Sequence, residues 1–247
     1  MRSESIGLPR LLSVSGTLAC CLLACVLSAS APAADSAAPS KGGSAPKTTA
    51  ANANVIRAPV EKWRLIESES GPVNYYRLLR EAERTFIRGA YRPPYEKAVF
   101  GFELPESGKG RVKRLDWSWR AIKLPHQADE CSPKKGDSPA VLYVTWKRML
   151  RWYSLKYVWS ATRPQGTVCE RRRNPFVAQD TIVLRSGGPL GVWRHESIDL
   201  AREFRAHFED GDPRADVPDL VGIAVMTDGD QTKTESTGDY ADFVFTY

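Results

Sequence analysis

The chain has 247 residues, of which 42% are apolar and 26% are charged, and it contains 18 Gly and 17 Pro. This composition is typical of a globular domain and argues against a collagen-like, coiled-coil or wholly disordered protein. The 35 basic and 29 acidic residues leave a net charge of +6, which is too small and too scattered to indicate nucleic acid as the partner.

The first 34 residues have the order of an export signal. Two arginines precede a mainly apolar run from Leu11 to Ala31, and small residues continue to Ala34. We predict a signal peptide over residues 1–34 and a periplasmic or secreted mature protein without a transmembrane segment. A lipid anchor at Cys25 and an uncleaved anchor are the alternatives.

Residues 35–54 contain, after Asp35, only Ala, Ser, Pro, Gly, Lys, Thr and Asn. Such a segment buries too little apolar surface to offset the entropy lost on ordering. We therefore predict a disordered linker, with a tether that holds the domain off a membrane as the functional alternative. The folded domain is predicted over residues 55–247.

The apolar residues of this domain fall mostly in short runs that are rich in aromatic and β-branched side chains, as in β-strands. The runs cover residues 98–104, 141–146, 155–159, 181–184, 220–226 and 243–247. Gly-, Pro- and Asp-containing turns lie between them, and no helical crossovers intervene. This pattern predicts an all-β fold, an antiparallel β-sandwich rather than a parallel sheet.

Two segments depart from the strand pattern. Residues 74–88 fit either a helix or two strands with a turn near 81–83. Residues 199–208 predict one short helix, because apolar residues recur every four positions, Asp199 can cap its start, and Gly and Pro follow its end. We expect the apolar stripe of this helix to face the core.

The mature chain would keep two of the five cysteines, Cys131 and Cys169, since the other three lie in the expected signal peptide. Two thiols in an oxidising compartment predict one disulfide. On the chain-entropy model it would stabilise the domain by about 3 to 4 kcal/mol. Free buried thiols are the alternative, and a reactive thiol lacks a histidine at a suitable spacing.

Five short sequence blocks carry a family resemblance. They are Leu115–Arg120, Lys134–Asp137 before the strand at 141–144, Tyr157–Ser160, Val183–Gly187 with Leu190–Trp193, and Met226–Thr232 before Tyr240–Phe245. In this order they resemble DUF3047, a family of uncharacterised exported proteins, over roughly Trp63 to Tyr247. The resemblance implies a jelly-roll sandwich of the galactose-binding-like type and no assigned activity.

The chain departs from this family's pattern at two of the blocks. The family's Gly-Asp-Asp is Gly-Asp-Ser at residues 136–138, and its Thr-Asp-Thr-Asp-Asn-Thr is Thr-Asp-Gly-Asp-Gln-Thr at 227–232. A role that needs the second acid at position 138 is therefore not expected.

An acidic segment follows the apolar run 220–226. Asp228, Asp230 and Thr232 alternate along it, and Asp242 comes shortly after. Oxygen ligands at this density suit a hard cation, so we predict Ca²⁺ as a cofactor bound by these four residues. The segment lacks the full ligand run of an EF-hand, and the alternative is a solvated acidic turn.

The predicted ligand-binding residues are mainly aromatic. Trp117 and Trp119 alternate in a strand pattern, which sends both indoles to one face and Arg120 to the other. That face is either a sugar-stacking platform or part of the core. Trp193 follows a Gly-rich turn and is a candidate for exposure, and Asp137 completes the set.

Basic and aromatic residues interleave in the middle of the chain. The basic residues are Lys147, Arg148, Arg151, Lys156 and Arg171 to Arg173, and the aromatic ones are Trp146, Trp152, Tyr153 and Trp159. Such a surface could bind anionic envelope glycans or lipid headgroups, or it could be a solvated face. Export argues against nucleic acid.

These observations predict an exported, monomeric, non-catalytic β-sandwich that binds carbohydrate or another envelope ligand. One alternative is a carbohydrate-active hydrolase that uses two of four carboxylates: Asp137, Asp228, Asp230 and Asp242. Another is a structural or partner-binding envelope protein, which would expose an apolar patch instead of a polar groove.

Overall fold

The computed structural model describes residues 54–66 and 74–247. The expected signal peptide, and the expected linker except Asn54, lie outside the described residues. The described residues belong to one compact unit that spans Pro46–Tyr247. In this part of the chain no helix is long and apolar enough to cross a membrane.

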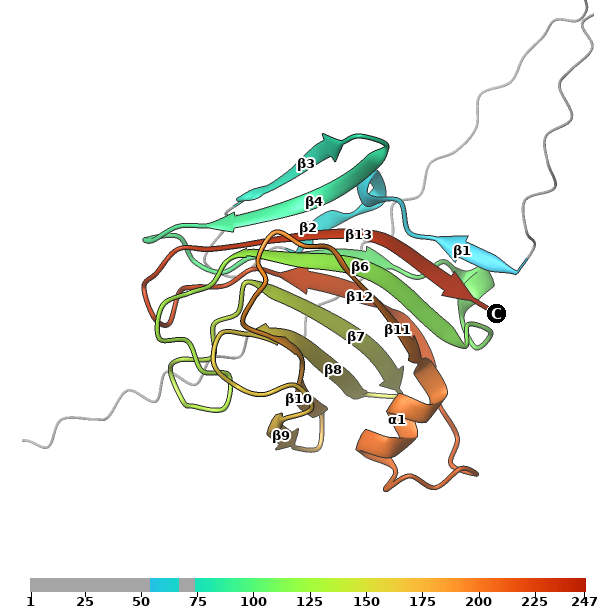
Figure 1. The fold of residues 1–247 in the computed structure, drawn as a ribbon. Coiled ribbons are helices and arrows are strands. Elements are labelled where there is room, and N and C mark those ends of the chain that lie inside the picture. The colour runs from blue at the N-terminus through green and yellow to red at the C-terminus, as the bar shows by residue number, and fades with distance from the viewer. Residues whose placement is uncertain (1–53, 67–73) are drawn as a thin grey trace, which may run out of the picture. The chain divides into compact units, whose positions relative to one another are not determined.

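Two β-sheets make up the body of this unit (Figure 1), as predicted. Sheet A has six strands, ordered β11-β6-β13-β4-β3 with β1 paired to β13. They are β1 (Val55–Arg57), β3 (Tyr76–Glu81), β4 (Arg84–Tyr91), β6 (Arg114–Lys123), β11 (Arg194–Asp199) and β13 (Ser236–Thr246). All strand pairs in sheet A are antiparallel.

Sheet B has seven strands in the order β2-β5-β12-β7-β8-β10-β9. They are β2 (Arg64–Ile66), β5 (Val99–Glu103), β7 (Ala140–Arg148), β8 (Arg151–Ser160), β9 (Val168–Arg173), β10 (Val177–Ser186) and β12 (Asp219–Met226). The remaining elements are the short 3₁₀ turns η1 (Val60–Lys62) and η2 (Glu106–Gly108), and the helix α1 (Leu200–Phe208).

One pair in sheet B departs from the predicted antiparallel pattern, because β10 runs parallel to β8. After β8 the chain passes to β9 at the sheet edge, and β10 then fills the position between them. Strand β9 runs opposite to β8, and β10 forms an antiparallel hairpin with β9, so β10 runs in the same direction as β8. The jelly-roll sandwich is therefore mixed at this edge.

The aromatic core lies between the sheets. Trp119 of sheet A faces Trp159 of sheet B, with ring centroids 6.0 Å apart, and Trp117 lies 6.1 Å from Tyr157. Both Trp117 and Trp119 are 0% exposed. The prediction of a sugar-stacking platform at these two indoles was wrong, because their face of β6 is the one that packs on the second sheet.

The two segments that departed from the strand pattern adopt different structures. Residues 74–88 contain β3 and the start of β4, which form a hairpin turning at Ala82, a residue with a φ of 51°. The helix near 199–208 is confirmed as α1, and the Asp199 carboxylate accepts a hydrogen bond from the Arg202 amide. The Phe204 ring in α1 is buried against Trp146 and Tyr153.

The predicted disulfide joins Cys131 to Cys169. It links the loop before β7 to β9 at the edge of sheet B. A disulfide fits an oxidising location outside the cytoplasm.

Candidate metal centre

Three aspartates meet at the end of sheet B where β7 begins and β12 ends. Strand β12 is antiparallel to β7, and Met226 pairs with Val141. The residues that follow β12 therefore lie beside those that precede β7. The Asp228 amide donates to the Ser138 carbonyl over 2.9 Å, which fixes the first turn after β12 next to Asp137.

Gly229 allows the chain to turn tightly between Asp228 and Asp230. A Cβ at this position would lie 2.1 Å from the Thr234 carbonyl oxygen and 2.7 Å from the Tyr91 ring. The Thr234 amide closes the turn by donating to the Gly229 carbonyl over 3.1 Å. Only glycine fits here without displacing backbone, so the turn holds both carboxylates on the same side of the loop.

One carboxylate oxygen from each of Asp137, Asp228 and Asp230 lies within 4.8 Å of the others. We call these three residues the aspartate cluster. Asp137 and Asp228 are 0% and 1% exposed, and Asp230 is half-buried, so the cluster reaches the surface at Asp230.

Hydrogen bonds fix Asp137 in place. Its Oδ2 accepts from the Thr232 amide over 2.6 Å and from the Thr232 hydroxyl over 2.7 Å, and its Oδ1 accepts from the Gln231 amide over 3.2 Å. Asp137 thus holds the loop after Asp230 in a single conformation.

The negative charge of the cluster is not neutralised by a basic partner. Within the described residues, no Lys, Arg or His nitrogen lies within 4.0 Å of its carboxylate oxygens. Asp230 Oδ1 is buried and has no hydrogen-bond partner. The site therefore holds buried negative charge and an unpaired carboxylate oxygen, and no positive group compensates them.

The pKa values of Asp228 and Tyr91 reflect this excess of negative charge. Burial, followed by the hydrogen bond and negative charge of Asp230, raises the pKa of Asp228 well above its ordinary value, and Lys97 opposes the shift only weakly. Burial and the negative charges of the cluster raise the pKa of Tyr91 to about 12. The site therefore favours taking up protons or a cation.

Two residues predicted as metal ligands do not join the cluster as ligands. The Thr232 hydroxyl donates to Asp137 and is also hydrogen-bonded to the Thr234 hydroxyl over 2.8 Å, so it positions Asp137 instead. Asp242 pairs with Arg84 over 3.1 Å. Its place on β13 puts it some 20 Å along the strand from the loop, at about 3.3 Å per residue.

Arg120 lies on the outer face of sheet A, away from the cluster. It is 8% exposed and binds Asp239 over 2.7 Å and Glu81 over 2.6 Å. Arg88 completes the group with a second ion pair to Asp239, again over 2.7 Å. The predicted ligand role of Arg120 is not supported by this geometry, because its guanidinium already joins β6 to β13 and to the β3–β4 hairpin.

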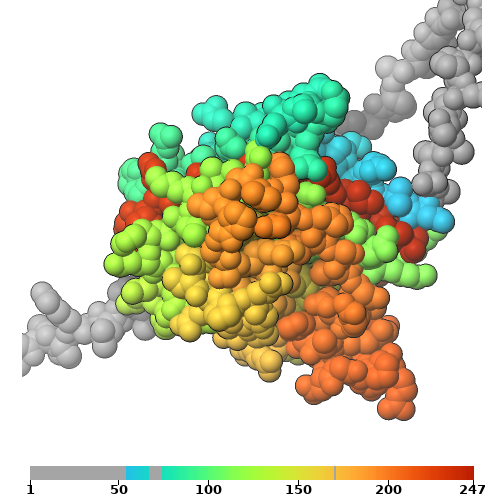
Figure 2. All heavy atoms as spheres, in the orientation of Figure 1, coloured from blue at the N-terminus to red at the C-terminus, as the bar shows by residue number. Residues whose placement is uncertain are grey.

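Trp193 packs on the same outer face. Its ring lies between the guanidinium carbons of Arg84 and Arg120, at 4.6 and 4.5 Å, and meets the edge of Phe86 with centroids 5.5 Å apart. The ring is half-buried. Trp193 therefore anchors the segment between β10 and β11, which forms part of the face toward the viewer in Figure 2.

Sequence reasoning placed Asp137 in the organic-ligand set and not among the predicted metal ligands, whereas the structure brings it into the aspartate cluster. The signal was available, because Asp137 precedes a strand and Asp228 follows another, and adjacent antiparallel strands bring such positions together. The pairing of β7 with β12 was not predictable from local patterns. Tyr91, whose ring packs on Gly229, carried no motif at all.

Comparisons with known proteins identify a family. The model of a family described as "Protein of unknown function (DUF3047)" matches residues 72–244. No curated protein matches the sequence.

Two solved structures show a distant similarity to this chain. One is the xyloglucanase domain of NopAA, a type three effector from Sinorhizobium fredii, in complex with cellobiose, with 9% identity, a TM-score of 0.41, and 81% of this chain and 100% of that chain covered. The other is Endoglucanase 3 of Trichoderma harzianum, from family GH12, with 10% identity, a TM-score of 0.38, and 80% and 99% covered. At these values neither likeness bears on function.

Proposed function

The chain belongs to the DUF3047 family, for which no function is described, and from its own site we propose that it is a Ca²⁺-binding, non-catalytic β-sandwich. The observation that carries this proposal is the aspartate cluster: three carboxylates within 4.8 Å of one another and no basic partner among the described residues. A divalent cation would neutralise the buried charge and satisfy the free oxygen of Asp230.

The donor set favours Ca²⁺ among common cations. All three ligands are carboxylate oxygens, which hard cations prefer, and the Ca²⁺ shell takes six to eight oxygens in flexible geometry. No Cys or His belongs to the cluster, which argues against Zn²⁺. Three side chains leave room in the coordination shell for water or ligand oxygens.

The ligand that we propose for this end of the sandwich is a glycan. A favourable observation is Tyr95, whose side chain is 47% exposed and whose carbonyl accepts a hydrogen bond from the Tyr91 hydroxyl over 2.6 Å. Tyr91 in turn packs on the turn of the aspartate cluster. A sugar could stack on the Tyr95 ring while its hydroxyls fill open positions on the cation.

The hydrolase alternative is less consistent with the geometry. Its acid and base need carboxyl groups about 5 to 9.5 Å apart across an accessible sugar. Two of the three residues of the aspartate cluster are fully buried, so they do not line a surface that a sugar could reach. Asp242, the fourth candidate, is paired with Arg84.

Thermal unfolding of the unit 46–247, in EDTA and then in Ca²⁺, tests the cation site. Binding at about 100 times Kd stabilises the native state by about 2.7 kcal/mol, which raises Tm by about 5 to 10 °C for a domain of this size. The double substitution Asp228→Asn with Asp230→Asn should abolish this shift.

Asp242→Asn is the matched control, because it removes an aspartate of the same sequence region that the structure places on another strand. It should keep the full Ca²⁺ response. If wild-type Tm is the same in EDTA and in millimolar Ca²⁺, the cation proposal is wrong. A glycan array probed with and without Ca²⁺ then tests the ligand, with Tyr95→Ala expected to weaken any binding.

A further inference from the structure

Two hairpins of sheet B end in exposed apolar side chains, at the opposite end of β7 from the aspartate cluster. The β7–β8 turn carries Met149 and Leu150, which are 89% and 77% exposed. The β9–β10 turn carries Phe176, which is 62% exposed. We call Met149, Leu150 and Phe176 the apolar tips. Side chains this large and this exposed contribute nothing to the core.

The register of the sheet brings the two turns together. Strand β10 pairs with β8, and Val177 stands opposite Trp152. The Trp152 amide donates to the Phe176 carbonyl over 2.8 Å. The turns that carry Phe176 and Leu150 therefore lie side by side, at the same ends of the neighbouring strands β10 and β8.

Basic side chains border the tips. The basic edge consists of Lys147, Arg148, Arg151, Arg171, Arg172 and Arg173. Arg148 is paired with Glu209 over 2.9 Å, and Arg173 with Asp180 over 2.6 Å. The other four form no ion pair with a described side chain, although Asp219 lies opposite Lys147 in the ladder.

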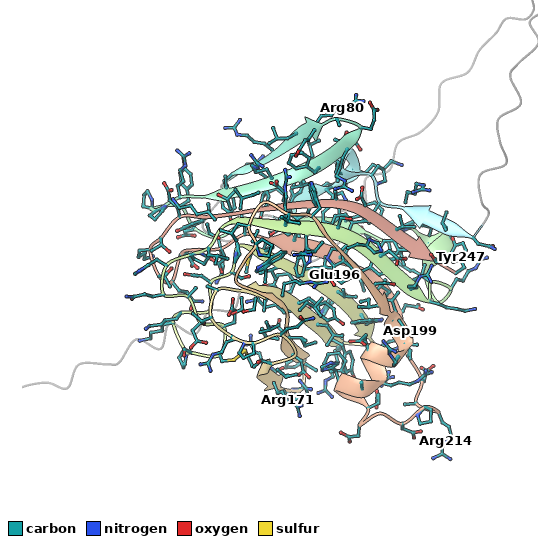
Figure 3. All side chains as sticks on the ribbon, in the orientation of Figure 1. Arg80, Arg171, Glu196, Asp199, Arg214 and Tyr247 are labelled. Carbon is teal, nitrogen blue, oxygen red and sulfur yellow. A yellow bond between two sulfur atoms is a disulfide. The ribbon has the colours of Figure 1, made fainter. Side chains whose placement is uncertain are left out.

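Two of these four cations face solvent, whereas Arg151 and Arg172 are half-buried. Lys147 and Arg171 are exposed, and Arg171, on β9, lies in the lower part of the view in Figure 3. Lys147 also lies 4.5 Å from the centroid of the half-buried Trp152 ring, which places an amphipathic aromatic side chain behind the tips. The edge thus presents apolar tips, an aromatic ring and a surplus of positive charge in one place.

We propose that the apolar tips and the basic edge dock this domain on a lipid bilayer that contains anionic headgroups. A bilayer matches each part of this surface. Apolar tips can enter the boundary of the acyl chains, Trp favours the headgroup level, and Lys and Arg bind anionic phosphates. A glycan would leave the aliphatic tips in water, and the hollow that Met149 lines with Lys147 and Leu220 does not include Leu150 or Phe176, as a peptide groove across the tips would.

Docking at this edge would leave the aspartate cluster free, because the two lie at opposite ends of β7. The bound domain would present its cation site away from the membrane. This inference is independent of the Ca²⁺ proposal, since it rests on other residues.

Co-sedimentation of the unit 46–247 with vesicles tests the proposal. Binding is expected to vesicles with roughly three parts in ten phosphatidylglycerol, and to be about tenfold weaker with phosphatidylcholine alone. The double substitution Met149→Ser with Leu150→Ser should reduce binding about tenfold. Leu78→Ser is the matched control, because Leu78 is 45% exposed on sheet A, and it should bind like wild type.

The stability of each variant should equal that of wild type, because the tips pack on nothing, and unfolding curves check this. Equal sedimentation of the tip variant and wild type, or no binding to anionic vesicles, would overturn the proposal. So would equal affinity for a soluble anionic polysaccharide. A dimer in sedimentation velocity that the tip variant dissociates would assign the tips to self-association instead.

Discussion

The two ends of β7 differ in almost every physical respect. At its start, buried acids are held by backbone amides, and their charge lacks a partner. At its end, basic and apolar side chains reach into solvent from hairpin turns. A buried and preorganised cluster suits a small ion, because the geometry exists before binding. An exposed and adaptable edge suits an extended surface. The same strand can therefore support two kinds of contact that do not interfere.

The aspartate cluster should respond strongly, and in opposite directions, to two single substitutions. Asp137→Ala leaves the amides of Gln231 and Thr232 without their acceptor and should cost about 2 to 4 kcal/mol in EDTA. Asp228→Asn removes a carboxylate whose pKa is raised by burial and by Asp230, so it should raise Tm in EDTA at pH 7. Both should lose the Ca²⁺ response.

Differential scanning calorimetry measures the Tm of both variants in EDTA and in Ca²⁺. It distinguishes the role of Asp137, which holds the loop by hydrogen bonds, from that of Asp228, whose buried charge repels its neighbours. A fall in Tm for Asp228→Asn in EDTA would show that its carboxylate is stabilising without a cation. The idea of an unneutralised cluster would then have to be given up.

The disulfide tests how firmly the acidic end of β7 is held, because Cys131 lies in the loop that carries Asp137. Replacing Cys131 and Cys169 by Ser opens a 38-residue separation and should cost about 3 to 4 kcal/mol. The same change should weaken Ca²⁺ binding, since the loop before β7 is held at this point. Calorimetry and a Ca²⁺ titration measure the two effects. An unchanged Ca²⁺ affinity would show that the loop before β7 keeps its place without the disulfide.

Much of the fold was accessible from the sequence, and the site less so. Period-two runs and a capped helix were sufficient for the sandwich and α1, because strand and helix patterns are local. Local patterns did not settle which face of β6 is buried, so Trp117 and Trp119 stayed ambiguous until the second sheet was in place. The cluster of Asp137 with Asp228 depends on which strands are neighbours, a long-range property that no motif encodes.

Glu130 gives a smaller, pH-dependent effect at the acidic end. Burial raises the pKa of Glu130, although the Ser160 hydroxyl donates to its Oε2. Its Oε1 is buried without a hydrogen-bond partner. The folded state thus favours the protonated form, and wild type loses stability as pH rises from about 4 through the raised pKa.

Glu130→Gln removes this titration and keeps the shape of the side chain. The difference in Tm, variant minus wild type, should therefore increase from pH 4 to pH 8. Thermal scans in EDTA at closely spaced pH values measure it. A difference that stays constant across this range would mean that Glu130 titrates alike in the folded and unfolded states.

Substitutions on the basic edge should have the smallest effect on stability and a clear effect on binding. Arg171→Gln and Lys147→Gln change exposed side chains without a described ion pair, so the free energy of unfolding should stay within about 0.5 kcal/mol of wild type. Binding to anionic vesicles should weaken and depend less on salt, because each variant has one cation fewer to contact the anionic headgroups. Sedimentation at two salt concentrations checks this. Arg80→Gln, on sheet A and far from the tips, should change neither stability nor binding. If Arg80→Gln weakens binding as much as the other two substitutions, vesicle binding depends on the net charge of the protein and not on the basic edge.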